Sequence, residues 1–193
     1  MKRMFALLVL FMCTTLLFGQ DKSEQTKAEP AKPAETKAES SKNPISDAVR
    51  EMFARQQKNL TEAVDAMPAD KFGYSPTPAQ APFGHLVMHI SMSNIELCSK
   101  AGSMPPPPMR PAPETDKVRL QAVLTRSFLY CESALSRVDD SKLGNPVEIF
   151  GGKQTTVAYA LIALTNGWAD HYSEAAMYLR LNGVLPPTAE PKK

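Results

Sequence analysis

Proline divides the chain into segments that carry helical patterns of apolar residues. Four windows contain no Pro: 45–67, 83–104, 114–145 and 147–185. Pro is excluded from helix interiors because it lacks an N–H and clashes with the preceding turn. In each window apolar residues recur at spacings of three and four, which is typical of an amphipathic helix. The pattern therefore predicts four helices within residues 43–187.

The ends of the first and last predicted helices carry local signals. Asn43 is a residue type that caps helices, and Pro44 suits the first helical position. At the other end, Gly183 is placed to end the fourth helix, and Pro186 and Pro187 prevent its continuation. The apolar positions expected to face the core are Ile45, Val49, Met52, Phe53, Leu60, Val64 and Met67 in the first helix and Leu120, Val123, Leu124, Cys131, Leu135 and Val138 in the third.

The connections between these helices suggest a topology. The segment 101–114 contains six Pro, and a polyproline stretch advances about 3.1 Å per residue. Such a linker can run the length of a bundle, so the second and third helices can be parallel. The segment 145–155 is either a short extended element across the bundle or a loop. We therefore expect an all-α four-helix bundle.

The first twenty residues have the layout of a secretory signal peptide. Lys2 and Arg3 precede an apolar run that ends at Phe18, and Gly19 offers a small residue for cleavage. The alternative is an uncleaved anchor. A lipid on Cys13 is less favoured, because large residues precede it. We expect cleavage near residue 20 and export to the periplasm or the medium, with no membrane span left after cleavage.

Residues 21–42 are predicted to form a disordered, low-complexity tether. They contain no large apolar residue, and Lys recurs at every fifth position from Lys22 to Lys42. Such a segment cannot bury enough apolar surface to offset its chain entropy. Residues 188–193 form a short tail. The net charge of +2, from 22 basic and 20 acidic residues, does not indicate a nucleic-acid partner, and three Cys are too few for a disulfide scaffold.

The chain has three His, which are its candidate metal ligands. His85 and His89 lie four apart on the second predicted helix, a spacing that lets two imidazoles reach one ion. His171 lies midway along the fourth helix, where Asp170 and Glu174 could accept hydrogen bonds from it. The alternative is that the His pair are ordinary polar residues, one at the surface and one hydrogen-bonded inside. The sequence contains neither a phosphate-binding loop nor a serine-nucleophile motif.

Several short stretches resemble the DinB-like four-helix bundles, a bacterial superfamily of metal-dependent hydrolases and thiol transferases. They are 83–90 and 170–172, the helix ending 178–187, the loop 74–78, and residues 150–152. The resemblance covers residues 43–187 and implies an up-down-down-up bundle. It also implies a metal held by three His, of which His89 and His171 match two. The third ligand position falls on Gly167, so this chain departs from the family pattern, and His85 is the available substitute.

Two functions follow from this resemblance. In the first, a divalent ion, Zn or Ni, is held by His89, His171 and His85, and the protein is a hydrolase or transferase for an unknown small molecule. In the second, the bundle holds no metal and binds a small molecule or a partner in the same pocket. In both cases we expect His89 and His171 to face each other across the bundle interior.

Export would leave two Cys in an oxidising compartment. Cys98 and Cys131 come close only if the second and third helices are parallel, so a disulfide between them would also test the topology. The alternative is that both are small, buried, free Cys.

Overall fold

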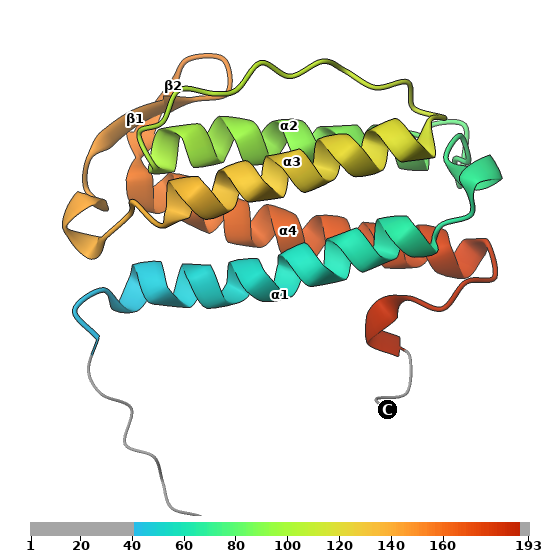
Figure 1. Ribbon diagram of the computed structural model, residues 1–193, viewed down its shortest axis with the longest axis horizontal. Coiled ribbons are helices and arrows are strands. Elements are labelled where there is room, and N and C mark those ends of the chain that lie inside the picture. Colours follow the sequence, from blue (N-terminus) through green and yellow to red (C-terminus); the bar gives the residue numbers. More distant parts are fainter. Residues whose placement is uncertain (1–40, 190–193) are drawn as a thin grey trace, which may run out of the picture. The chain divides into compact units, whose positions relative to one another are not determined.

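The computed structural model describes residues 41–189, which form four long helices and one short hairpin (Figure 1). The predicted signal peptide, nearly all of the predicted tether and the last four residues lie outside the described residues. Within the described part, no helix combines the length and apolar character needed to cross a membrane. The four long helices are α1 (Pro44–Ala66), α2 (Phe83–Ala101), α3 (Lys117–Leu135) and α4 (Val157–Leu181), and the strands of the hairpin are β1 (Pro146–Ile149) and β2 (Lys153–Thr156).

The helices run up, down, down and up, as the sequence predicted (Figure 1). A disulfide joins Cys98, near the end of α2, to Cys131, near the end of α3, with the Cα atoms 5.2 Å apart. This pairing requires α2 and α3 to be parallel. Near the end of α4, the Tyr178 hydroxyl donates to the carbonyl of Ala81, just before α2, at 2.5 Å. Helix α4 is therefore antiparallel to α2.

The start of α1 is capped from a distant part of the chain. Asn43 is the N-cap residue of α1 and Pro44 the first helical residue, as predicted, but the Asn43 side chain does not cap the helix, contrary to expectation. Instead the carboxylate of Asp140 accepts from the backbone N–H groups of Ile45 and Ser46, at 3.0 and 2.9 Å. The Asn43 side chain accepts from the N–H of Asp140 in return. These bonds fix the start of α1 beside the segment that follows α3.

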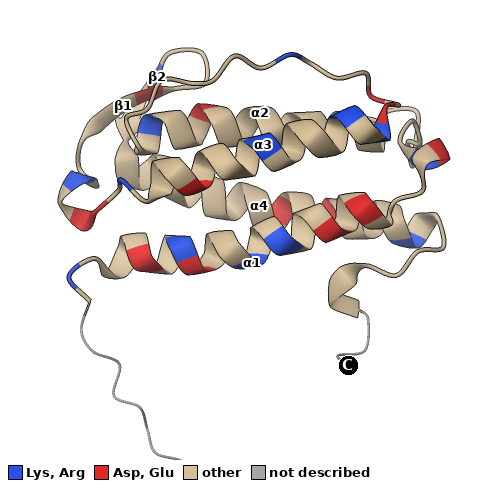
Figure 2. Ribbon diagram, viewed as in Figure 1, with Lys and Arg blue, Asp and Glu red and all other residues tan. Residues whose placement is uncertain are grey.

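The apolar stripes pack one continuous core between the four helices. The third-helix stripe is buried or half-buried throughout, whereas Ile45 and Met52 of the first-helix stripe are exposed. Both lie at the edges of the predicted apolar face, and the buried face of α1 is narrower than the prediction. Helix α1 carries charges of both signs (Figure 2), with ion pairs such as Arg50 with Asp47 at 2.6 Å.

The Pro-rich linker runs back along the bundle, as expected, and returns to the start of α2 (Figure 1). There the carbonyl oxygen of Glu114 lies so close to Gly84 that a side-chain Cβ would overlap it. At the other end of α2, a Cβ on Gly102 would lie 2.6 Å from the carbonyl oxygen of Ala134. Glycine is therefore needed at both ends of α2, where the linker and α3 approach its backbone.

Residues 146–156 form the antiparallel β1–β2 hairpin, so the segment for which the sequence allows an extended element or a loop is extended. Ile149 pairs with Lys153, and residues 150–152 form the turn. All three turn residues have positive φ, including Phe150 at 28°. The hairpin leads directly into α4, whose first turn is capped by the Thr156 hydroxyl accepting from the N–H of Tyr159.

Helix α4 ends as predicted at Gly183, which has a φ of 74°. The N–H of Val184 donates to the carbonyl of Leu179 and the N–H of Gly183 to that of Arg180, which is the pattern of a glycine-ended helix. The chain then turns back, so that the N–H of Thr188 donates to the Tyr172 hydroxyl at 3.1 Å. The first residues of the predicted tail thus pack on the bundle.

Candidate functional site

His89 and His171 face each other between α2 and α4. Their ring centroids are 4.9 Å apart and the ring planes are nearly perpendicular, at 85°. The antiparallel pairing of α2 with α4 brings the middle of one helix beside the middle of the other. The prediction that the two rings meet is therefore confirmed, but they do not meet deep in the interior. His89 is exposed, and the side chain of His171 keeps 20% of its surface accessible.

Partial burial and the neighbouring imidazole of His89 lower the pKa of His171 below its ordinary value of 6.5, and Asp170 opposes this shift weakly. The lowered pKa favours the neutral imidazole, in which one ring nitrogen can accept a hydrogen bond. Of the two acids expected to support it, Glu174 lies 3.9 Å from Nδ1 of His171. Asp170 instead accepts from the Asn166 side chain at 3.1 Å.

His85 is engaged elsewhere, although it lies only one turn from His89. Its Nδ1 lies 2.7 Å from a carboxylate oxygen of Glu114 on the Pro-rich linker, and the side chain is half exposed. It does not line the pocket that holds His89 and His171. The structure therefore brings together two of the three candidate ligands and places the third against the linker.

Gly167 lies one turn before His171 on α4, facing the same space. A Cβ built there would lie 3.9 Å from Nε2 and Cδ2 of His171 and would meet no closer atom. The resemblance described above places the third metal ligand at this position, and here it carries no side chain. The missing side chain leaves room beside the His pair.

This room is part of a pocket of about 320 Å³ between α2, α4 and the hairpin turn. Its floor is apolar, with Leu164 and Trp168 from α4 and Leu97 from α2. The two imidazoles and Ser93 supply polar groups. An apolar hollow with a few convergent polar groups is the usual form of a small-molecule site.

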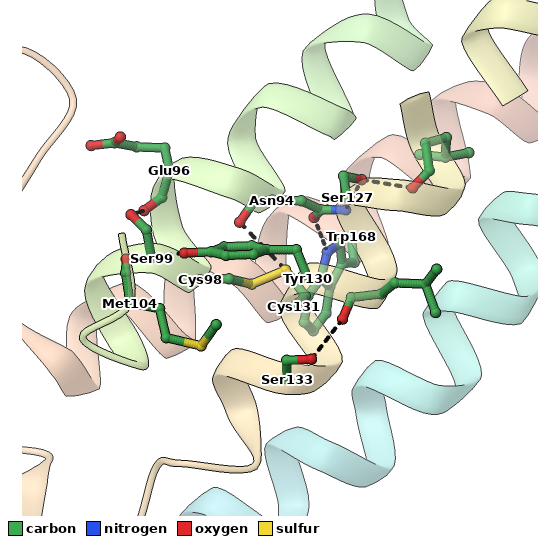
Figure 3. The surroundings of a disulfide bond; sticks show 12 residues. Asn94, Glu96, Cys98, Ser99, Met104, Ser127, Tyr130, Cys131, Ser133 and Trp168 are labelled. Atoms are coloured by element: carbon green, nitrogen blue, oxygen red, sulfur yellow. Dashed lines mark hydrogen bonds between the residues drawn. A yellow bond between two sulfur atoms is a disulfide. The ribbon is translucent and has the colours of Figure 1, made fainter. Parts of the chain in front are cut away.

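A buried polar network, which the sequence pattern did not predict, shapes the pocket floor. Asn94 is only 1% exposed, and its side-chain oxygen accepts from the indole N–H of Trp168 at 2.7 Å (Figure 3). The amide nitrogen of Asn94 donates to the Ser127 hydroxyl at 3.1 Å. Each group is satisfied, which offsets the cost of burying it. The available signal was an Asn inside an otherwise apolar helix, in a chain with a single Trp.

The residues present do not fit a three-ligand metal site. Among residues 41–189, no three His, Cys, Asp or Glu side chains are grouped so that they could hold an ion. Asn94 cannot serve as a third donor without giving up its bonds to Trp168 and Ser127. Among the described residues, His89 and His171 are the only His, Cys, Asp or Glu side chains that line this pocket.

The chain belongs to the DinB superfamily, whose family model matches residues 52–175. A DinB-like protein from Bacillus cereus has a similar structure, with a TM-score of 0.62 at 15% identity, over 73% of this chain and 95% of that one. A DinB-like protein from Bacillus subtilis gives 0.59 at 16% identity, over 75% and 99%. These likenesses confirm the predicted fold.

A mycothiol-dependent maleylpyruvate isomerase is a further structural neighbour, with a TM-score of 0.53 at 13% identity. The likeness covers 67% of this chain and 60% of that one. At such identity it shows a shared fold alone. No curated protein matches the sequence.

Proposed function

We propose that this protein is a metal-free DinB-type bundle that binds an uncharged small molecule in the pocket beside His89 and His171. Gly167 carries this proposal, because the position where the family pattern has a third ligand is open space next to an apolar floor. The lowered pKa of His171 favours its neutral form, which suits a hydrogen bond to a polar group of the ligand rather than an ion pair. The ligand would replace water against Leu164 and Trp168.

Trp168 makes the proposal directly testable. It is the only Trp of the chain, so its indole N–H gives a single NMR signal, and its ring lines the pocket. We expect acetophenone, a small uncharged aromatic ketone, to shift this signal saturably. Gly167→Leu should fill the pocket and weaken binding at least about tenfold, which corresponds to about 1.4 kcal/mol.

Ala169→Leu is the matched control, because Ala169 is exposed on the same helix and does not line the pocket. It should bind acetophenone as the unaltered protein does. The proposal is wrong if acetophenone leaves the Trp168 signal unchanged, or if Gly167→Leu and Ala169→Leu bind it equally well.

Metal binding is the second candidate function, and the facing imidazoles of His89 and His171 favour it. A metal-dependent hydrolase or transferase activity would require this site to hold an ion. Two His bind a divalent ion weakly compared with the three or four ligands of protein zinc sites. We therefore rank this function below small-molecule binding.

We also propose that the protein is exported. The signal-like pattern of residues 1–20 supports export. The Cys98–Cys131 bond supports it as well, because disulfides persist mainly in oxidising compartments. N-terminal sequencing of the native protein should return a residue near Gln20. Recovery of Met1 on a cytosolic protein would contradict export.

A further inference from the structure

A second hollow adjoins the pocket and shares part of its wall. It has a volume of about 490 Å³ and lies between α2 and the Pro-rich linker. His89, Ser93 and Phe150 line both spaces. The pocket on the Trp168 side is called the inner pocket below. The second hollow, which contains Met88, Met92 and Met109, is called the methionine groove.

The methionine groove is apolar and adaptable. Met88 and Met92 lie one turn apart on α2, and the linker supplies Met109 and Pro111 from the opposite side. Unbranched thioether side chains rearrange readily around apolar ligands of different shape. Met92 is 57% exposed, whereas most other apolar residues of α2 are buried in the core. An exposed Met in this position suits contact with an apolar chain.

Phe150 stands where the two spaces meet. Its φ of 28° is a conformation that bulky residues rarely adopt, and its ring is 53% exposed. The next two residues, Gly151 and Gly152, would accept this conformation without strain. Strained residues persist where the surrounding structure imposes them and are concentrated at functional sites. At position 150 this strained backbone conformation places an aromatic ring beside both spaces.

The charges around the two spaces argue against an anionic ligand. The linings include no Lys or Arg among the described residues, and Glu96, in the methionine groove, is their one carboxylate. Glu174 also lies near the His pair. The polar groups where the spaces meet are imidazoles and the Ser93 hydroxyl, which suit an uncharged carbonyl or hydroxyl group.

We propose that the inner pocket and the methionine groove form one elongated site for an uncharged molecule with an apolar ring, a central carbonyl-type group and an alkyl chain. The ring occupies the inner pocket, the polar group meets His89 and His171, and the chain lies along Met92 past Phe150. This inference rests on the proposed function and specifies the class of its ligand.

Two ketones test the proposal by calorimetric titration: acetophenone and hexanophenone, which has four more methylenes. A fully buried methylene contributes about 0.8 kcal/mol, or about fourfold in affinity. In an open groove we take half of this free energy, so the longer ketone should bind about sixteenfold more tightly. Met92→Lys places a charge in the groove and should reduce this ratio to about twofold or less.

Met177→Lys is the matched control, because Met177 is 45% exposed on α4 and lines neither space. It should keep the full ratio of hexanophenone to acetophenone affinity.

Phe150→Gly relieves the backbone strain, so it should raise the unfolding midpoint yet weaken hexanophenone binding severalfold. If acetophenone binds but the longer chain adds nothing, or if Met177→Lys acts like Met92→Lys, the elongated site is refuted and the inner pocket stands. If acetophenone does not bind, the proposed function itself fails.

Discussion

Gly167→Ala should stabilise the protein, although Gly167 lies at the candidate site. Glycine inside a helix costs about 1 kcal/mol relative to alanine, because it loses more backbone entropy on folding. The added Cβ would meet nothing closer than the His171 ring at 3.9 Å, an ordinary van der Waals contact. No steric cost therefore opposes the gain. We expect the free energy of unfolding to rise by about 1 kcal/mol, or the melting temperature by about 2–4 °C.

Gly102→Ala provides the contrast, because the same atom added at the end of α2 would lie 2.6 Å from the carbonyl oxygen of Ala134. Moving α3 away would strain a packed interface, so this variant should lose about 1–3 kcal/mol. Urea unfolding followed by circular dichroism measures the free energy of unfolding of both variants, provided that its dependence on urea concentration is the same in each. A loss of stability in Gly167→Ala, or equal gains in the two variants, would refute the conclusion that position 167 is open.

Three further predictions concern the disulfide, pH and metal. Denatured, non-reduced protein without its signal peptide should show no free thiols, and reducing the Cys98–Cys131 bond, which closes a loop over a separation of 33 residues, should cost about 3–4 kcal/mol in urea unfolding. The pKa of His171 is lowered in the folded state, so the unfolded chain takes up the proton first as pH falls. The contribution of His171 to stability should therefore be constant above about pH 6.5 and decline as pH falls from there toward the lowered pKa. His171→Gln should flatten this decline, as measured by urea unfolding midpoints. Zinc titrations of the unaltered protein should show weak binding. His85→Ala should leave this binding unchanged, and Gly167→His should strengthen it. Loss of zinc binding in His85→Ala would mean that His85 leaves Glu114 to act as a ligand.

Most boundaries of the helices could be predicted because they depend on a few neighbouring residues, but α3 ends at Leu135, before Val138, which the apolar pattern assigned to the third helix. Pro is excluded from helix interiors wherever the helix lies in the fold, and Gly183 adopts positive φ because no side chain opposes it. The length of the Pro-rich linker allowed a parallel course of α2 and α3, and the family resemblance implied it. Cys98 and Cys131 could be paired because that course brings the ends of the two helices together.

The cap of α1 illustrates what the sequence alone could not determine. Asn43 has the right residue type at the right position, yet Asp140 accepts the N–H groups of Ile45 and Ser46 instead. A side chain about 95 residues away reaches the first turn because the chain after α3 passes beside it. Local propensity ranks the residues within a segment, but it does not describe which distant groups compete with them.

The candidate site depended on tertiary structure for the same reason. The spacing of His85 and His89 places both on neighbouring parts of one helix face, but the Glu114 carboxylate takes one imidazole and α4 brings His171 to the other. Asn94, Trp168 and Ser127 are far apart in the chain and form one network only because three helices meet there. The sequence by itself determined where most of the helices begin and end and which residues can carry chemistry. Only the packed bundle decided which of them meet, because the rotation of each helix about its axis is set by the neighbours it packs against.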